Sequence, residues 1–382
     1  MIDRVTSPES PSRIDLSPYD AVVLVSFGGP EAAEEVVPFL ENVTRGRGIP
    51  RERLVEVGEH YFGFGGRSPI NDQCRALLAA LRTGLAERGC SVPVYWGNRN
   101  WHPFLADTLA EIVADGHHRV LALTTSAYPS YSSCRQYREN LYDAVRNGTA
   151  GDLDVAVDRI RQYATHPGFV AASVDATTEA LDRLDASAGV GPVRLVFVTH
   201  SIPTAMSDTS GPGDGGYLEW HQTVARAVAG EVGARRGTTY DHDLVFCSRS
   251  GPPSQPWLEP DVNDHLRGLA AAGAGGAVLV PIGFVSDHME VVYDLDTEAV
   301  ATAAEIGLPV ARAATAGTHP AFVGALLDLL AERAAVARDE DVTPAAVPGG
   351  PVGRYVCPAD CCPNLRDPAR PALCQTAAHA AV

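Results

Sequence analysis

Short apolar runs alternate along this chain with longer segments in which hydrophobic residues recur at helical spacing. Runs such as AVVLV and AVLVPI are rich in β-branched residues and have the length of buried strands. The predicted strands occupy residues 20–27, 92–97, 119–125, 193–200, 241–247 and 276–282. The predicted helices lie within residues 30–43, 102–116, 261–273 and 283–299. This alternation predicts an α/β protein whose parallel strands are covered by helices on both faces.

The two halves of the sequence resemble each other. Residues 101–128 can be laid against residues 257–284 with the same order of tryptophan, helix, glycine and strand. Trp101 then falls near Trp257, and the aligned pairs are Asp107 with Asp264, Leu109 with Leu266, and Gly116 with Gly273. We therefore predict two similar α/β halves with parallel sheets. Ligands in such sheets bind beyond the carboxyl ends of the strands, so residues directly after each strand are the candidates for function.

Changes in composition suggest four segments. Residues 1–19 form a polar N-terminal extension, and residues 20–180 are predicted to be the first α/β half. Residues 181–341 are predicted to be the second half with a terminal helix. Residues 342–382 are rich in proline, glycine and cysteine, which indicates an appended tail without a sheet of its own.

Charge and composition exclude several classes of protein. The 382 residues carry a net charge of −17, which argues against nucleic-acid binding because phosphates need basic patches. The chain contains no lysine, so any fixed cation that binds an anionic ligand is an arginine. No run approaches the roughly 20 apolar residues of a membrane span, and the N-terminus lacks the apolar core of a secretory signal. We expect a cytoplasmic protein whose cysteines are thiols or metal ligands.

His200 comes directly after the apolar run VRLVFVT, and Glu290 follows another predicted strand, so both are expected at the mouth of the sheet. A histidine there can simply cap a turn, or it can act as a base or metal ligand. Glu290, Asp294 and Glu298 recur every four residues, which is typical of a solvated helix face. Such a row is also tolerated where a cation binds, because carboxylates at this spacing repel one another. An imidazole and a carboxylate facing one cleft would suit a divalent transition metal.

Three loops offer candidate contacts for a ligand. Arg45 and Arg47, in TRGRG, are either solvated or form bidentate hydrogen bonds to a ligand carboxylate. Ser68 lies in the glycine-rich stretch GFGGRSPI, which lacks the pattern of a phosphate-binding loop. The tyrosines of SAYPSYSSCRQY, Tyr137 among them, are either packing residues or contacts for a flat ligand.

The cysteines of the tail are the most specific feature of its composition. Cys357, Cys361, Cys362 and Cys374 lie close together in a proline-rich segment. They do not form the paired Cys-x-x-Cys units of a common zinc site. Zinc bound with irregular spacing and an iron–sulfur cluster both remain open from the residues alone.

Six motifs together resemble the ferrochelatase family over roughly residues 20 to 340. They are SFGGPE, TRGRG, GGRSPI, VTHSIP, PWLEPDV and VPIGFVSDHMEVVYDLDTE. The resemblance implies a chelatase fold of two Rossmann-like halves and a lyase that inserts ferrous iron into a porphyrin. The cysteine-rich tail is similar to that of actinobacterial members, which implies coproporphyrin III as the substrate in haem biosynthesis. A chelatase for cobalt or nickel and a non-catalytic iron- or haem-binding protein are the alternatives.

The resemblance also implies roles for individual residues. His200 corresponds to the catalytic histidine and Glu290 to its partner, both facing the ferrous iron substrate. Asp294 and Glu298 match an acidic path for protons or metal. The implied porphyrin contacts are Ser68, Tyr137, Arg45, Arg47 and Phe27, the last at a place where some relatives have tyrosine.

The same resemblance implies a 2Fe-2S cluster. Cys134 matches the internal cysteine that joins C-terminal ones in cluster-bearing relatives. Cys357, Cys361 and Cys362 are the expected tail ligands, with Cys374 as a substitute for one of the adjacent pair. The expected partners are the porphyrin and ferrous iron, and the resemblance allows transient contact with neighbouring enzymes of the haem pathway.

Overall fold

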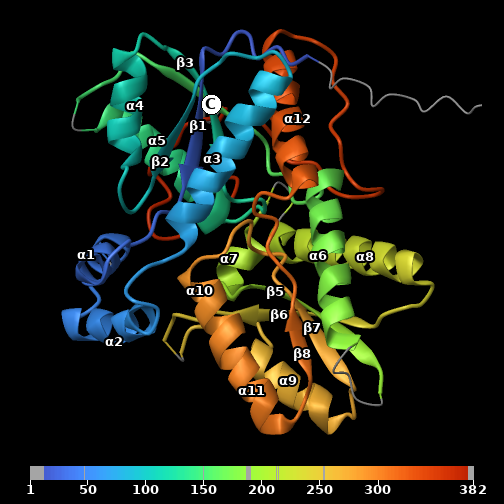
Figure 1. Cartoon of the computed structure of the whole chain (residues 1–382). Coiled ribbons are helices and arrows are strands. Elements are labelled where there is room, and N and C mark those ends of the chain that lie inside the picture. Colours follow the sequence, from blue (N-terminus) through green and yellow to red (C-terminus); the bar gives the residue numbers. More distant parts are fainter. Residues whose placement is uncertain are drawn as a thin grey trace, which may run out of the picture.

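Two parallel sheets of four strands each form the framework of the protein (Figure 1). The computed structural model describes residues 13–376 except 47, 149, 186–190, 212, 214 and 253. The first sheet contains β1 (Ala21–Ser26), β2 (Val94–Asn98), β3 (Arg119–Thr124) and β4 (Ala156–Arg159). The second contains β5 (Val193–His200), β6 (His242–Cys247), β7 (Gly276–Val280) and β8 (Val310–Arg312). Helices flank both sheets, which confirms the predicted fold class.

The helices connect these strands in chain order. In the first half they are α1 (Ala33–Val43), α2 (Arg51–Phe62), α3 (Ile70–Glu87), α4 (Leu105–Ala114), the π-helix η1 (Tyr131–Arg135) and α5 (Gln136–Arg146). Then follow α6 (Pro167–Asp185), α7 (Thr204–Asp208), α8 (Gly216–Arg236) and α9 (Val262–Ala271). The last are α10 (Met289–Val291), the π-helix η2 (Val292–Ala299), α11 (Val300–Ile306) and α12 (Pro320–Ala337).

The two sheets have the same topology. Their strand orders are β2-β1-β3-β4 and β6-β5-β7-β8, and every pairing is parallel. The loops after β2 and β6 also match, since Asn98 N donates to the Pro103 carbonyl over 2.7 Å and Phe246 N to the Pro260 carbonyl over 2.9 Å. The predicted likeness of the two halves is therefore present in strand order and in detail.

Burial explains which strands the sequence reveals. Every residue of β1 and of β7 is buried, so both strands read as continuous apolar runs. The edge strands β4 and β8 are short and polar, with the sequences AVDR and VAR. They carry no apolar run, which is why the hydrophobic pattern did not predict them.

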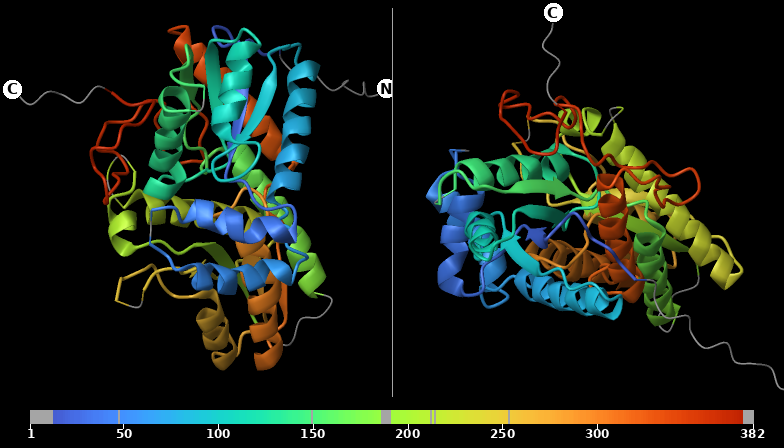
Figure 2. Two further views of the ribbon diagram at one scale, coloured as in Figure 1. Left: turned by 90° about the vertical axis from the view of Figure 1, so that its left-hand side faces the viewer. Right: turned by 90° about the horizontal axis from the view of Figure 1, so that it is seen from above.

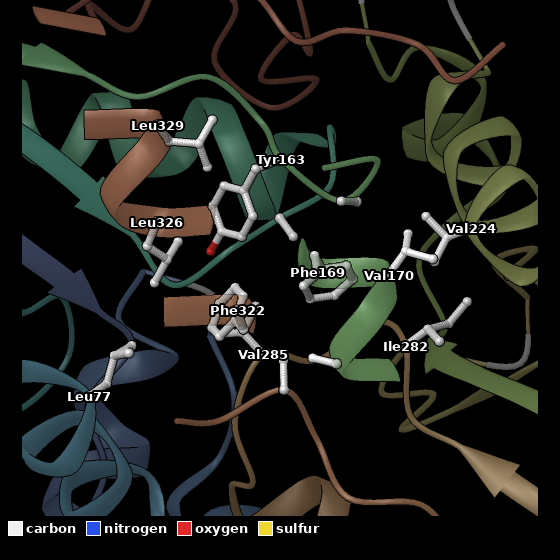
Figure 3. Close-up of a cluster of buried hydrophobic side chains, with 14 of the residues drawn as sticks. Leu77, Tyr163, Phe169, Val170, Val224, Ile282, Val285, Phe322, Leu326 and Leu329 are labelled. Carbon is white, nitrogen blue, oxygen red and sulfur yellow. The ribbon is translucent and has the colours of Figure 1, made fainter. Parts of the chain in front are cut away.

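Two long helices are exchanged between the halves. α6 packs against β7, β8 and α8 of the second half, whereas α12 packs against α3 and β3 of the first. They cross where Phe169 and Phe322 meet at 5.7 Å between ring centroids, inside one core that continues through both halves (Figure 3). The boundaries expected near residues 180 and 341 divide the chain by sequence order and stay a prediction. By packing, α6 belongs with the second half and α12 with the first.

The tail covers one side of the first half. Its described residues, 342–376, form no helix or strand beyond a single bridge between Cys357 and Gln375. It lies beside α5 (Figure 2), where Leu373 N donates to the Arg138 carbonyl over 3.1 Å. Within the described part of the chain, no helix has both the length and the hydropathy needed to cross a membrane.

Candidate active site

His200 is the last residue of β5, so the strand itself carries its side chain to the edge of the sheet. The imidazole is 30% exposed, and its Nδ1 atom contacts the carbonyl oxygen of Ser201. A nitrogen facing a carbonyl must carry the proton, so the neutral ring has its lone pair on Nε2. That atom lies 3.5 Å from Oε2 of Glu290. The histidine therefore presents a basic nitrogen beside a carboxylate.

Glu290 belongs to α10, which follows β7 after a turn. β5 and β7 are neighbours in the sheet, with Phe197 opposite Val280, so both residues emerge at the same carboxyl edge. The structure thus brings together the two residues that the sequence placed after separate strands. The carboxylate is 52% exposed, so solvent and a ligand can reach the pair.

His288 is a third polar group at this site that sequence reasoning did not assign. Its Nδ1 atom lies 3.9 Å from Oε2 of Glu290. Burial lowers the pKa of His288, the Glu290 carboxylate opposes this shift, and His200 adds to it. In the sequence, the only signal for a role of His288 was its place two residues before Glu290.

The acidic row continues along η2. Burial, together with the charges of Glu290 and Glu298, raises the pKa of Asp294 to about 6, although a hydrogen bond from the Ser248 hydroxyl opposes the shift. Glu298, farther along, is exposed. Val291, Leu295 and Ala299 of the same helices are buried. The row therefore leads from the His200 edge to solvent while the opposite face packs into the core.

The α1–α2 pair (residues 33–43 and 51–62), called the α1–α2 hairpin below, covers this edge from the first half (Figure 2). His60 of α2 stacks on Tyr293 of η2 with ring centroids 3.8 Å apart. The neighbouring Tyr61 is close enough to Glu290 that burial and then this carboxylate raise the pKa of its phenol. The hairpin therefore contributes aromatic side chains to the surroundings of the pair.

The expected porphyrin contacts that the structure describes all lie in the first half. Ser68 is 3% exposed and packs on Gly29, where an added Cβ would come within 2.8 Å of the Ser68 Cβ. Tyr137 is also buried, and the Arg99 guanidinium lies 4.3 Å from its ring centre and 5.6 Å from that of Phe27. Among the described residues, none of these side chains forms a hydrogen bond or ion pair with His200 or Glu290.

Arg99 is therefore a further residue that the sequence did not single out. Its Nε atom donates to Asn140 Oδ1 over 2.7 Å, which fixes the guanidinium between two aromatic rings. The only signal in the sequence was its position directly after β2. Of the basic loop, Arg45 is exposed and forms no ion pair with any described residue, and Arg47 lies outside the described residues.

Comparison with known proteins gives this geometry a context. The family model described as ferrochelatase matches residues 19–334. The chain belongs to the ferrochelatase family. The predicted resemblance is thereby confirmed, and the match ends before the cysteine-rich tail.

Relatives and solved structures agree with this family. The coproporphyrin III ferrochelatase of Streptomyces coelicolor is 56% identical over 359 residues, which cover 92% of this chain and 96% of the relative. A ferrochelatase of Rhodopirellula baltica is 47% identical over 358 residues, covering 94% and 96%. The structure of SirB from Bacillus subtilis with Fe3+ aligns with a TM-score of 0.50 at 12% identity, over 84% of this chain and 97% of SirB. At that identity the likeness shows the fold alone.

Four cysteines meet in a buried cluster, three of them beyond the family match. They are Cys134 of η1 and Cys357, Cys361 and Cys362 of the tail. Arg159 Nη2 donates to Cys357 Sγ over 3.1 Å. Hydrogen bonds from Cys357 and Cys362 lower the pKa of Cys134 and of Cys361, and the buried Arg138 guanidinium lowers both further.

Cys374 lies outside this cluster. Its Sγ faces the Val157 carbonyl at 3.4 Å, and burial raises the pKa of its thiol to about 11. In the described residues no three His, Cys, Asp or Glu side chains converge tightly enough to hold a single metal ion. A binuclear cluster is a different case, because its four thiolates are shared between two irons. The donor set, a buried group of four thiols with an arginine donating to sulfur, fits such a cluster.

Proposed function

We propose that this chain inserts ferrous iron into coproporphyrin III in haem biosynthesis, which makes it a lyase. The observation that carries the proposal is the approach of His200 Nε2 to Glu290 Oε2 at 3.5 Å, at the exposed carboxyl edge of the sheet. Family membership supplies the reaction class. The named substrate of the Streptomyces coelicolor relative supports coproporphyrin over other porphyrins.

In this reaction two pyrrole N–H bonds break and the iron becomes bound to the porphyrin nitrogens. Ferrous iron replaces two protons, so the charge balances and no electron is transferred. Neutral His200 can accept a pyrrole proton at Nε2 because its Nδ1 is held by the Ser201 carbonyl. Glu290 shares this role or holds the arriving iron.

The acidic row would carry protons away from the pair or iron towards it. Asp294, with a pKa raised to about 6, can both take up and release a proton near neutral pH. Exposed Glu298 would exchange with solvent. The half-buried Asp294 and the exposed Glu298 therefore suit a path for protons or iron between the His200–Glu290 pair and solvent.

For the porphyrin, we propose contacts on the side of the first half. Phe27, Ser68 and Tyr137 would line the macrocycle, with Arg99 holding the two rings in place. Arg45 and Arg47 would meet the propionates, since guanidinium groups bind carboxylates at two points and the chain has no lysine.

We also propose that Cys134, Cys357, Cys361 and Cys362 hold a 2Fe-2S cluster. When bound, such a group is a redox-active link between the tail and η1. Arg159 and Arg138 would compensate thiolate charge in this buried place.

Ferrous iron and the porphyrin are the proposed partners of the chain, and the cytoplasm is its proposed location. We also propose transient contact with neighbouring enzymes of the haem pathway.

An anaerobic assay of the purified full chain with ferrous iron tests the substrate. Coproporphyrin III and protoporphyrin IX are offered separately, and the metallated product is identified by its absorbance and mass. We expect faster turnover with coproporphyrin III. Faster turnover with protoporphyrin IX would reject the proposed substrate, and insertion of only cobalt or nickel would reject the proposed metal.

A further inference from the structure

The backbone of His200 is held by a tyrosine of another element. Tyr217, in the first turn of α8, donates its hydroxyl proton to the His200 carbonyl over 2.8 Å. The same hydroxyl lies 2.9 Å from Oγ1 of Thr199. Tyr217 is 5% exposed, so these bonds form inside the protein. α8 is thereby attached to the end of β5, at the residue whose side chain meets Glu290.

His221 fixes the direction of these hydrogen bonds. Burial lowers its pKa to about 3, so the ring is neutral at physiological pH. Its Nδ1 lies 2.7 Å from the Tyr217 carbonyl and must carry the proton, which leaves Nε2 to accept from the Thr199 hydroxyl over 2.9 Å. Because Thr199 donates its own proton to His221, its Oγ1 and the His200 carbonyl both act as acceptors for the single hydroxyl proton of Tyr217, the donor that joins α8 to the end of β5.

The start of α8 is in turn connected to the cysteine cluster. Gly216 N donates to the Ser210 carbonyl over 2.7 Å, and the next residue, Gly211, donates its N–H to Cys362 Sγ over 3.1 Å. Trp220, one turn along α8, lines the same small cavity as Gly211 and the four cysteines. Two successive hydrogen bonds therefore connect Cys362, through residues 210 and 211, to the helix turn that carries Tyr217.

We propose that Tyr217 is a positioning residue for His200, and that the tail stabilises the position of Tyr217 through the hydrogen bond from Gly211 to Cys362. The catalytic part of this inference rests on the proposed function. A thiolate accepts a hydrogen bond more strongly than a thiol does, so a bound cluster would strengthen the Gly211 contact. The cysteine-rich tail then supports the geometry of iron insertion from outside the active site.

Tyr217→Phe removes the hydroxyl and keeps the ring, and Tyr163→Phe is its matched control. Tyr163 is equally buried and donates to the Thr124 carbonyl over 2.8 Å, in the other half. We expect kcat for iron insertion to fall up to roughly tenfold in Tyr217→Phe, with the KM for porphyrin unchanged. Amide hydrogen exchange over residues 199–203 should rise as well. Wild-type kcat and exchange in this variant would overturn the assignment.

Cys362→Ser, with Cys374→Ser as control, tests the connection to the tail. Hydrogen exchange over residues 199–203 and 216–221 should increase in Cys362→Ser and stay at the wild-type level in Cys374→Ser. Equal exchange in both variants would overturn the role of the tail. If the wild-type chain inserts no iron, the proposed function fails, whereas the exchange experiment still decides whether the tail holds His200.

Discussion

The imidazole of His60 and the phenol of Tyr293 lie face to face, with centroids 3.8 Å apart and planes 6° from parallel. This stack joins the α1–α2 hairpin of the first half to the acid-bearing η2 of the second. Since Tyr61 of the same hairpin lies near Glu290, the stack also fixes one wall of the proposed active site.

His60→Ala should therefore loosen the hairpin. An aromatic pair contributes about 0.5–1.5 kcal/mol, so we expect faster hydrogen exchange over residues 51–62 and a KM for porphyrin raised roughly two- to tenfold. His117→Ala is the control, because His117 meets Tyr95 only edge-on at 6.1 Å between ring centroids and belongs to the first half. Equal exchange and KM in both variants would show that the stack does not hold the hairpin.

The raised pKa of Asp294 predicts how stability changes with pH. The folded protein binds a proton at this carboxyl up to about pH 6, whereas the unfolded chain releases it near pH 4. Stability contributed by this group is therefore lost as pH rises through that window. Asp294→Asn should stabilise the metal-free protein by about 1–3 kcal/mol at pH 7.5, and by less towards pH 4–5.

Chemical denaturation of the metal-free protein at several pH values measures this effect. Asp296→Asn serves as the contrast, because Asp296 on the same helix pairs with Arg312 Nε over 2.5 Å. Removing that ion pair should destabilise the protein at pH 7.5. A pH-independent effect of Asp294→Asn would contradict the raised pKa.

The crossing of α6 and α12 should tolerate no added volume. A Cβ at Gly168 would lie 2.3 Å from the Ala321 carbonyl oxygen, so Gly168→Ala should cost about 1–3 kcal/mol of unfolding free energy. Gly230→Ala, in α8, meets nothing within 4 Å and should stabilise by up to about 1 kcal/mol. Thermal unfolding compares the two variants, and similar melting temperatures would contradict the packing described for this crossing.

Arg159 should control how well the tail retains a cluster. Its Nη2 donates to Cys357 Sγ, and the nearby cysteine sulfurs raise the pKa of Arg159 although burial opposes this. We expect Arg159→Gln to be purified with at least roughly twofold less iron and sulfide per chain, because a charged donor to sulfur is lost. Arg161→Gln removes a neighbouring buried arginine that pairs with Glu332 instead, and it should keep wild-type content. Absence of iron and sulfide from the wild-type chain would reject the cluster itself.

Much of the fold could be predicted from the sequence because its central strands are mostly buried. The apolar runs of β1, β3, β5 and β7 and the helical spacing between them were sufficient to predict two parallel sheets. The exchange of α6 and α12 could not be predicted, because α6 was not among the predicted helices and the terminal helix was assigned to the second half by chain order. Which sheet each helix covers depends on close packing at the crossing, which hydrophobic patterns do not encode.

The candidate site was predictable where strand ends determine it. His200 ends β5 and Glu290 follows β7, its parallel neighbour, so topology alone brings them to one edge. Arg99 and Tyr217 act through contacts with residues distant in sequence, on Tyr137 and on the His200 carbonyl, and no local pattern marks them. The choice of Cys361 and Cys362 over Cys374 likewise depends on how the tail lies against η1.

The most direct test of this account is iron insertion by His200→Ala under anaerobic conditions with coproporphyrin III. His118→Ala is the control, because it changes an exposed histidine that directly precedes β3, at the amino end of that strand in the first half. The wild type and the control should form Fe-coproporphyrin III, while His200→Ala should still bind the porphyrin and insert iron at least roughly 100-fold more slowly. Near-normal insertion by His200→Ala would contradict the account.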